Sequence, residues 1–190
     1  MEVIPAKSAG FCFGVARAVR MAEELASSGR KAKMLGHIIH NDHEIARLSN
    51  LGLAAISTPE EAGEGDCVLL RAHGEGRAVH EILAARGASV VDATCPKVAW
   101  VQRIVRDAEQ EGRQPVMIGD PMHSEVRGVG GWCENLQVFS GPEEVLSWTR
   151  GLGNATDLPL TVVSQTTLRR EIWESSLKIL KKQCTNLKIF

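Results

Sequence analysis

Tyrosine is absent from this 190-residue chain, and aromatic residues make up only 4% of it. Proteins that bind single-stranded nucleic acid stack the bases on aromatic side chains, so this composition argues against such a surface. The formal net charge is −1, which provides no global field for nucleic acid or an anionic membrane. No apolar run approaches the roughly 18 residues that span a bilayer, and the N-terminus lacks a signal-peptide core. The sequence therefore predicts a cytoplasmic protein with no nucleic-acid and no membrane partner.

Paired cysteine motifs are missing too. The five cysteines, at positions 12, 67, 95, 133 and 184, are odd in number and form no C-x-x-C pair. This pattern argues against a disulfide framework and against a local zinc knuckle. A metal bound by these thiols would therefore need a fold that gathers them from distant parts of the chain. The motifs G-x-x-x-x-G-K-S/T and G-x-G-x-x-G are also absent, which leaves a P-loop or Rossmann nucleotide site unsupported.

What the chain does contain is a regular alternation of short apolar runs and amphipathic segments, which is typical of an α/β protein with mainly parallel strands. We expect strands at residues 2–6, 33–36, 53–57, 66–71, 88–91, 115–119, 136–140, 160–163 and 187–190. We expect helices at residues 15–28, 42–51, 77–86, 96–110, 142–149 and 169–184, with a very short one opened by Thr58-Pro59-Glu60-Glu61.

The predicted fold class is therefore α/β, with two similar units of mainly parallel sheet flanked by helices. The first unit spans residues 14–95 and the second spans residues 96–190. Residues 1–13 form an N-terminal strand and a loop that carries Cys12. No low-complexity segment or charge run separates the two units, which favours a shared interface over a flexible linker.

The stretch Asp92-Ala93-Thr94-Cys95-Pro96 lies between an apolar run and an amphipathic segment. Cys95 thus lies between the end of a predicted strand and the start of a predicted helix, and Pro96 suits the first helical position. The positive end of the helix dipole favours a thiolate, which makes Cys95 a plausible metal ligand or nucleophile. The alternative is a small buried residue at a strand-to-helix turn.

Reactive residue types gather at the carboxyl ends of the predicted strands, where parallel α/β sheets bind ligands. They are Cys12, His37, His40, His73, Cys95, His123, Glu125 and Thr166. Each taken alone is also compatible with a loop residue, a core residue or a helix cap, but together they favour one shared pocket. Glycines and helix N-termini in these loops suit an anion, so a phosphorylated substrate fits. Cys67 lies inside an apolar predicted strand and is interpreted as a core residue, whereas Cys133 and Cys184 look structural or incidental.

Six motifs occur in an order and spacing that resemble one known family. They are Gly10-Phe11-Cys12-Phe13-Gly14-Val15, His40-Asn41, Ala72-His73-Gly74, Asp92-Ala93-Thr94-Cys95-Pro96, His123-Ser124-Glu125-Val126 and Ser164-Gln165-Thr166-Thr167. Each motif is weak alone, but their conjunction is highly specific. The chain resembles, from end to end, the LytB family of 4-hydroxy-3-methylbut-2-enyl diphosphate reductases of the non-mevalonate isoprenoid pathway.

The resemblance implies an oxygen-sensitive 4Fe-4S oxidoreductase built of three similar α/β domains with pseudo-threefold symmetry. Such an enzyme removes the hydroxyl of its allylic diphosphate with two electrons and protons, which yields isopentenyl and dimethylallyl diphosphates. The resemblance also implies an external electron donor such as ferredoxin or flavodoxin. An iron of the cluster that lacks a protein ligand would act as a Lewis acid on the substrate oxygen.

The roles of individual residues are likewise implied by the resemblance. Cys12 and Cys95 would be metal ligands of the cluster. His40 and His73 would hold the diphosphate, and His123 would orient the substrate. Glu125 would supply protons and Thr166 would relay them or position the substrate. His37, His43 and His80 have no assigned role.

The sequence departs from the family pattern in one respect. The family has a third cluster cysteine in an Ile-Cys motif that opens a third domain, and this motif does not occur in the sequence in hand. We expect that domain to be absent from the sequence in hand, and this 190-residue chain to be inactive unless a complementing domain is present. The alternative is a non-catalytic diphosphate-ligand-binding or interaction module. A third possibility is a hydrolase with a His/Cys-bound zinc.

Overall fold

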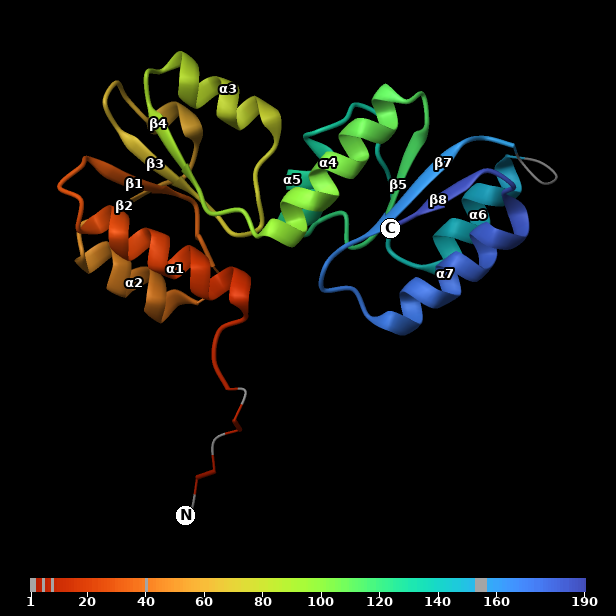
Figure 1. Ribbon diagram of the computed structural model, residues 1–190, viewed down its shortest axis with the longest axis horizontal. Coiled ribbons are helices and arrows are strands. Elements are labelled where there is room, and N and C mark those ends of the chain that lie inside the picture. The colour runs from red at the N-terminus through yellow and green to blue at the C-terminus, as the bar shows by residue number, and fades with distance from the viewer. Residues whose placement is uncertain (1–2, 5, 8, 40, 153–156) are drawn as a thin grey trace. The chain divides into compact units, whose positions relative to one another are not determined.

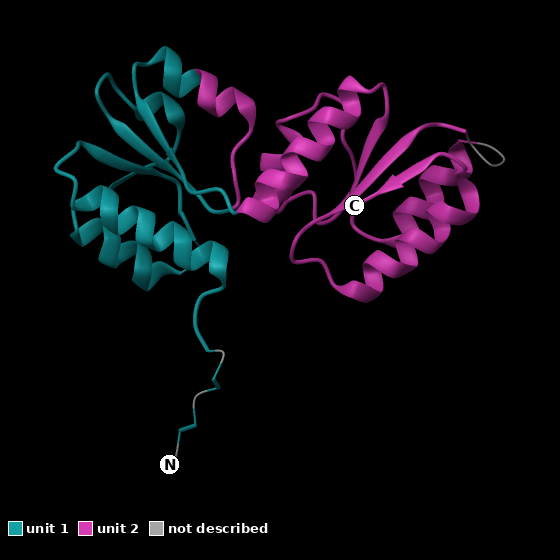
Figure 2. Ribbon diagram, in the orientation of Figure 1, with its two compact units in different colours: residues 1–72, 82–95 teal, residues 73–81, 96–190 magenta. Residues whose placement is uncertain are grey.

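The computed structural model describes residues 1–190 apart from 1–2, 5, 8, 40 and 153–156. The chain divides into two compact units, shown in different colours in Figure 2. Unit 1 comprises residues 1–72 and 82–95, and unit 2 comprises residues 73–81 and 96–190. The segment 73–81 thus clusters with the second half of the chain although it follows a strand of the first.

The described residues form two four-stranded, all-parallel sheets, one in each unit (Figure 1). The strand order is β2-β1-β3-β4 in unit 1 and β6-β5-β7-β8 in unit 2, which is the same topology used twice. The predicted fold class, two similar parallel α/β units, is confirmed.

The elements of the first half follow one another in alternation. They are α1 (Phe13–Ala26), β1 (Ala32–Leu35), α2 (Asp42–Asn50), β2 (Ala54–Ile56), the 3-10 helix η1 (Pro59–Glu61), β3 (Cys67–Leu70), α3 (Arg77–Ala85) and β4 (Ser89–Asp92). The predicted short helix at Thr58–Glu61 is present as η1, where the Glu61 carboxylate accepts from the Thr58 backbone N–H at 2.9 Å.

The second half repeats the scheme. Its elements are α4 (Pro96–Gln110), β5 (Gln114–Ile118), α5 (Ser124–Gly130), β6 (Gln137–Phe139), α6 (Pro142–Gly151), β7 (Leu160–Ser164), α7 (Arg170–Gln183) and β8 (Leu187–Ile189). In Figure 1, α4 and α5 lie together on one side of this sheet and α6 and α7 on the other.

The central strands explain why apolar runs dominate the sequence signal. All four residues of β3 are buried, and so are Pro115–Ile118 of β5 and Leu160–Val163 of β7. Strands covered on both faces are continuous apolar runs rather than alternating patterns. Each sheet therefore has its own core, and the carboxyl ends of its strands share one edge.

Two expectations about elements were wrong. The described residues of the expected strand 2–6 have no strand structure, and Val3 and Ile4 are 75% and 82% exposed. An apolar run becomes a strand only where a sheet edge pairs with it. In contrast, α5 was not expected, because Gly128 and Gly130 lower its intrinsic helix propensity.

A buried carboxylate stands at the opposite edge of the unit 1 sheet. Asp66 precedes β3 and is fully buried, with its oxygens 2.7 Å from Lys31 Nζ and 2.8 Å from Lys33 Nζ. The two ammonium groups hold the pKa of the Asp66 carboxyl well below its usual range, with help from the Gly63 N–H. This ion triad ties the start of β1 to the start of β3.

None of the helices in the described part of the chain is long and apolar enough to cross a membrane.

Candidate active site

Cys95 lies where the chain leaves β4 and enters α4, as the sequence predicted. The turn is held by Asp92, whose side chain accepts from the Thr94 backbone N–H at 2.8 Å and from the Thr94 hydroxyl. The Cys95 N–H donates to the Ala72 carbonyl at 2.9 Å. The cysteine is thereby fixed against the chain that leaves β3.

Cys12 lies at the start of α1, in the same unit as Cys95. It is the exposed N-cap residue of that helix, and its carbonyl accepts from Ala16 N at 2.9 Å. Two residues on, a Cβ added to Gly14 would lie 2.8 Å from the Cys95 sulfur. Only glycine lets the first turn of α1 pack this closely on Cys95. Cys12 and Cys95 thus both lie beside the close contact between the first turn of α1 and Cys95, within unit 1.

Arg17 of α1 fixes this packing from one turn further along the helix. Its Nη1 donates to the Thr94 carbonyl at 3.2 Å, which joins two segments 77 residues apart. The sequence reasoning missed Arg17. Its spacing of one turn from Gly14 is the signal that could have found it, since it puts both residues on one face of α1.

The remaining cysteines take no part in the contact between α1 and Cys95. Cys67 is fully buried within β3, so its prediction as a core residue is confirmed. Burial raises the pKa of the Cys133 thiol to about 12, and the nearby Glu109 carboxylate adds to the rise. Burial also raises the pKa of Cys184. Among the residues that the structure describes, no three His, Cys, Asp or Glu side chains form a group able to hold a metal ion.

In unit 2, Glu125 and Thr166 are brought together across 41 residues of sequence. Glu125 lies in the first turn of α5 and is only 2% exposed. One of its carboxylate oxygens accepts from the Thr166 backbone N–H at 2.6 Å, and the other accepts from the Thr166 hydroxyl at 2.7 Å. Thr166 itself is exposed, so its hydroxyl connects a buried carboxylate to the surface.

His123 is the N-cap residue of α5, and its Nδ1 accepts from the Glu125 backbone N–H at 3.1 Å. The imidazole of His73 meets the His123 ring edge to face, with the centroids 5.6 Å apart and the planes at 82°. Two predicted ligand-binding histidines from different strand ends are therefore neighbours in unit 2.

Gln165 organises the loop that carries Thr166, and the sequence reasoning gave it no role. Its side-chain oxygen accepts from Asp120 N at 3.0 Å, and its amide nitrogen donates to the Thr167 hydroxyl at 2.9 Å. It is 7% exposed and lies against Gly119, where a Cβ would be 2.9 Å from the Gln165 Cβ. Gln165 therefore joins the ends of β5 and β7, on which Glu125 and Thr166 depend.

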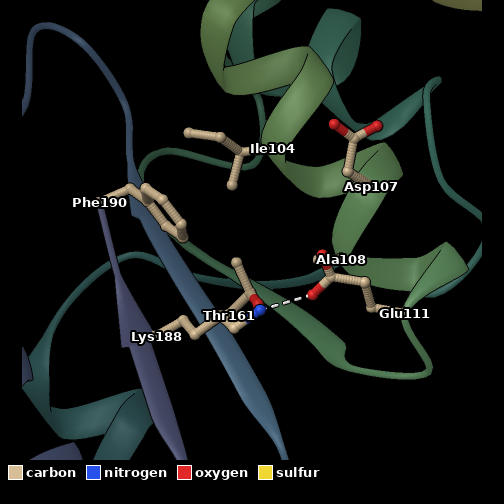
Figure 3. Close-up of a pocket in the computed structure, with 7 residues that line it drawn as sticks. All are labelled: Ile104, Asp107, Ala108, Glu111, Thr161, Lys188 and Phe190. Carbon is tan, nitrogen blue, oxygen red and sulfur yellow. Dashed lines mark hydrogen bonds and ion pairs between the residues drawn. The ribbon is translucent and has the colours of Figure 1, made fainter.

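A cavity of about 300 Å³ adjoins Thr166. It is lined by Lys97, Trp100, Val101, Val163, Ser164, Thr166 and Phe190. A second cavity of about 180 Å³ lies between α4, β7 and β8 (Figure 3). There, Lys188 Nζ pairs with a Glu111 carboxylate oxygen at 2.6 Å, and no predicted site residue takes part. The first cavity is therefore the one associated with the candidate site.

The other histidines differ in their surroundings. His40 lies outside the described residues. His37 is exposed, with its Nδ1 3.9 Å from an Asp42 carboxylate oxygen. His80 packs its ring against Trp132 at a centroid distance of 5.8 Å. The single pocket for all the predicted residues stays a prediction, while the contacts of Glu125 with Thr166 and of His73 with His123 are observed.

Two parallel sheets of the same topology, each flanked by helices, define an α/β protein, a class in which ligands bind at the carboxyl ends of the strands. The family model described as LytB protein matches residues 3–190. The chain belongs to the LytB protein family.

The relatives agree with this membership. The chain is 36% identical over 199 residues to the 4-hydroxy-3-methylbut-2-enyl diphosphate reductase of Caldanaerobacter subterraneus subsp. tengcongensis, with 100% of this chain and 66% of the relative covered. The enzyme of that name from Aquifex aeolicus is 38% identical, with 97% and 66% covered. The chain thus spans slightly less than two thirds of the length of these relatives.

Solved structures give the same result. The structure of a (E)-4-hydroxy-3-methyl-but-2-enyl diphosphate reductase superposes with a TM-score of 0.84 at 36% identity, and 99% of this chain and 66% of that chain are covered. The reductase structure from Plasmodium falciparum gives a TM-score of 0.85 at 24% identity, with 96% and 57% covered, which supports the fold alone.

Proposed function

We propose that this chain supplies the proton-handling and diphosphate-binding residues, and two iron ligands, of a 4-hydroxy-3-methylbut-2-enyl diphosphate reductase. The observation that carries the proposal is the double hydrogen bond between Thr166 and the buried Glu125 carboxylate, beside His123. Membership of the LytB family and relatives of that name support it.

Glu125 and Thr166 form the proton path. Because Glu125 is 2% exposed, a substrate hydroxyl reaches it through the exposed Thr166 hydroxyl. In the proposed step, Glu125 first takes up a proton, and the Thr166 hydroxyl then gives its own proton to the substrate oxygen while it receives the proton of the Glu125 carboxyl. The carbon–oxygen bond breaks and the oxygen leaves as water. Two electrons and a second proton enter the allylic carbons, which gives the two isomeric products.

His73 and His123 hold the diphosphate end of the substrate. The Nδ1 of His123 accepts from the Glu125 N–H, which fixes this imidazole at the start of α5. The neighbouring His73 ring adds a second imidazole at the same place. Two imidazole donors suit the oxygens of a diphosphate. His40 joins them in the proposal through the family motif.

Cys12 and Cys95 fit an iron–sulfur cluster as two of its ligands. Both stand at helix N-termini, whose positive partial charge suits a thiolate, and the missing side chain at Gly14 lets the first turn of α1 pack on Cys95. A bound 4Fe-4S cluster would supply the two electrons and a Lewis-acidic iron for the substrate oxygen. The proposal includes an external donor such as ferredoxin or flavodoxin and a cytoplasmic setting.

The test uses this chain within a protein of its relatives' full length, reconstituted anaerobically with iron and sulfide. We expect a brown protein that converts the allylic diphosphate with a reduced viologen as donor. Cys12→Ser and Cys95→Ser should each lose bound iron and activity, while Cys133→Ser retains both. If the two site variants keep wild-type iron content and activity, the proposal is wrong.

The Thr166 variants test the proton path separately from the cluster. Thr166→Val removes the hydroxyl and keeps the backbone N–H, while Thr166→Ser keeps both. Loss of a general acid–base relay costs about 10²–10⁴-fold in turnover, so we expect that fall for the valine variant at unchanged iron content. The serine variant should stay within about tenfold of wild type. Equal turnover in both variants would exclude a relay through the hydroxyl.

A second candidate function is diphosphate binding without catalysis by the 190-residue chain alone. The edge-to-face pair formed by the His73 and His123 rings, which lies wholly within unit 2, supports this candidate. We then expect a colourless protein that binds inorganic diphosphate in calorimetry. His73→Ala should weaken that binding about 10- to 100-fold, since a hydrogen bond to a charged group contributes about 1.5–3 kcal/mol. Stoichiometric iron in the isolated chain would exclude this candidate.

A further inference from the structure

The loop that carries His73 is docked on α5 through backbone rather than through side chains. A Cβ added to Gly128 of α5 would lie 2.5 Å from the Gly74 carbonyl oxygen and 3.4 Å from that of His73. Real Cβ atoms do not approach a backbone oxygen so closely. Gly128 is therefore required for the loop to lie at this distance from the helix.

A second contact of the same kind lies one helical turn further on. A Cβ added to Gly131, the residue after α5, would lie 2.5 Å from the Gly76 Cα. Beside it, the Arg77 N–H donates to the Gly131 carbonyl at 3.1 Å. The two glycines at positions 128 and 131 face the same loop, because residues three apart share a helix face.

Hydrogen bonds to one carbonyl complete the docking. The Glu75 carbonyl accepts from Trp132 Nε1 at 2.9 Å and from Gln102 Nε2 at 3.4 Å. Glu75 is 7% exposed. The loop is thus held at Gly74, Glu75 and Gly76 in succession, and these contacts explain why residues 73–81 cluster with unit 2.

This docking has a consequence for the two histidines. His123 is the N-cap of α5, and His73 begins the loop that docks on the same helix. One seven-residue helix therefore sets the position of both imidazoles, whose centroids are 5.6 Å apart. Any side chain at position 128 would clash with the Gly74 carbonyl, so the loop, and His73 with it, would have to shift relative to α5.

We propose that Gly128 and Gly131 are positioning residues of the diphosphate site, because their backbone contacts with the 73–77 loop set the spacing of the His73 and His123 rings. The ligand is a diphosphate group, and in that respect the inference rests on the proposed function. The glycines touch no ligand and act through His73.

The test measures the binding of inorganic diphosphate to the 190-residue chain by calorimetry, together with ring-to-ring contacts of His73 and His123 by NMR. Gly128→Ala should weaken binding about tenfold or more and remove the ring contact. The matched control is Gly130→Ala in the same helix, where the new Cβ would meet only Leu136, at 3.6 Å. This control should keep both wild-type affinity and the ring contact.

A double-mutant cycle separates positioning from a general structural effect. In a His73→Ala background, Gly128→Ala should weaken binding no further, because the residue it positions is gone. An equal effect in both backgrounds would overturn the proposal. If Gly128→Ala does not fold, Trp132→Phe removes one hydrogen bond from the docked loop and should weaken binding about two- to fivefold.

The two proposals fail in different ways. If wild type and His73→Ala bind diphosphate equally, or wild type does not bind it, the diphosphate assignment in the proposed function is wrong, and the inference loses its ligand. If Gly128→Ala keeps the ring contact and binds within twofold of wild type, the docking does not set the spacing. In that case the inference alone is wrong.

Discussion

The double hydrogen bond between Thr166 and Glu125 predicts a measurable loss of stability in Thr166→Val. Valine keeps the shape of threonine and the backbone N–H, whose bond to one Glu125 oxygen is 2.6 Å long. It removes the hydroxyl donor, 2.7 Å from the other oxygen of a carboxylate that is 2% exposed. A hydrogen bond to a charged group contributes about 1.5–3 kcal/mol. Since Thr166 is exposed, water replaces part of the bond, and we expect about 1.5–2 kcal/mol.

The tryptophans provide an assay for the unit concerned. All four, at positions 100, 132, 148 and 173, lie within residues 96–190, which belong to unit 2. Fluorescence therefore reports the unfolding of unit 2, while circular dichroism reports both units. In urea, the fluorescence transition of Thr166→Val should move to lower concentration with an unchanged slope.

Thr166→Ser is the control, because it retains both donors to Glu125. We expect it to lose less than about 1 kcal/mol. In a Glu125→Gln background, Thr166→Val should cost less than in wild type, since the charge that strengthens the bond is gone. If the valine and serine variants agree within about 0.5 kcal/mol, the hydroxyl bond to the carboxylate does not stabilise unit 2.

Three further predictions concern other parts of the molecule. Asp66→Asn should lower the free energy of unfolding more at about pH 7 than at about pH 2, because a depressed carboxyl pKa contributes stability that is lost as the pH falls. Exposed Cys12 should react with iodoacetamide at about pH 8 at least tenfold faster than Cys133, whose pKa of about 12 leaves a thiolate fraction of about 10⁻⁴. Gly14→Ala should destabilise unit 1 by about 1–3 kcal/mol in chemical denaturation followed by circular dichroism, since its Cβ would lie 2.8 Å from the Cys95 sulfur.

The two stability predictions each have a control variant in the chain, and the labelling prediction is itself a comparison of two thiols. Glu24→Gln removes an exposed ion pair with Arg20 and should change stability by less than about 0.5 kcal/mol at either pH. Gly151→Ala introduces a Cβ with no atom within 4 Å and should not destabilise the protein. A pH-independent effect of Asp66→Asn, equal labelling of the two thiols, or equal stability of the two alanine variants would contradict the respective reasoning.

Much of the fold was predictable because its signals are local. The α4 helix begins and ends where the sequence predicted, since Pro96 opens it and Gly112 follows its end. The buried strands appeared as apolar runs within one or two residues of their observed bounds. The α5 helix was missed for an equally local reason, because a short glycine-rich segment has little helix propensity.

The sequence by itself determined the repeated α/β architecture and the gathering of reactive residue types at strand ends, because hydrophobic periodicity and parallel topology are enough for both. Only the tertiary structure decided which of those residues touch. The register of β5 on β7 pairs Ile118 with Ser164, so both strands end level and their loops meet. That register brings Thr166 to Glu125, and the close approach at Gly128 brings His73 to His123. Such contacts depend on packing between distant segments, and periodicity within one segment carries no information about that packing.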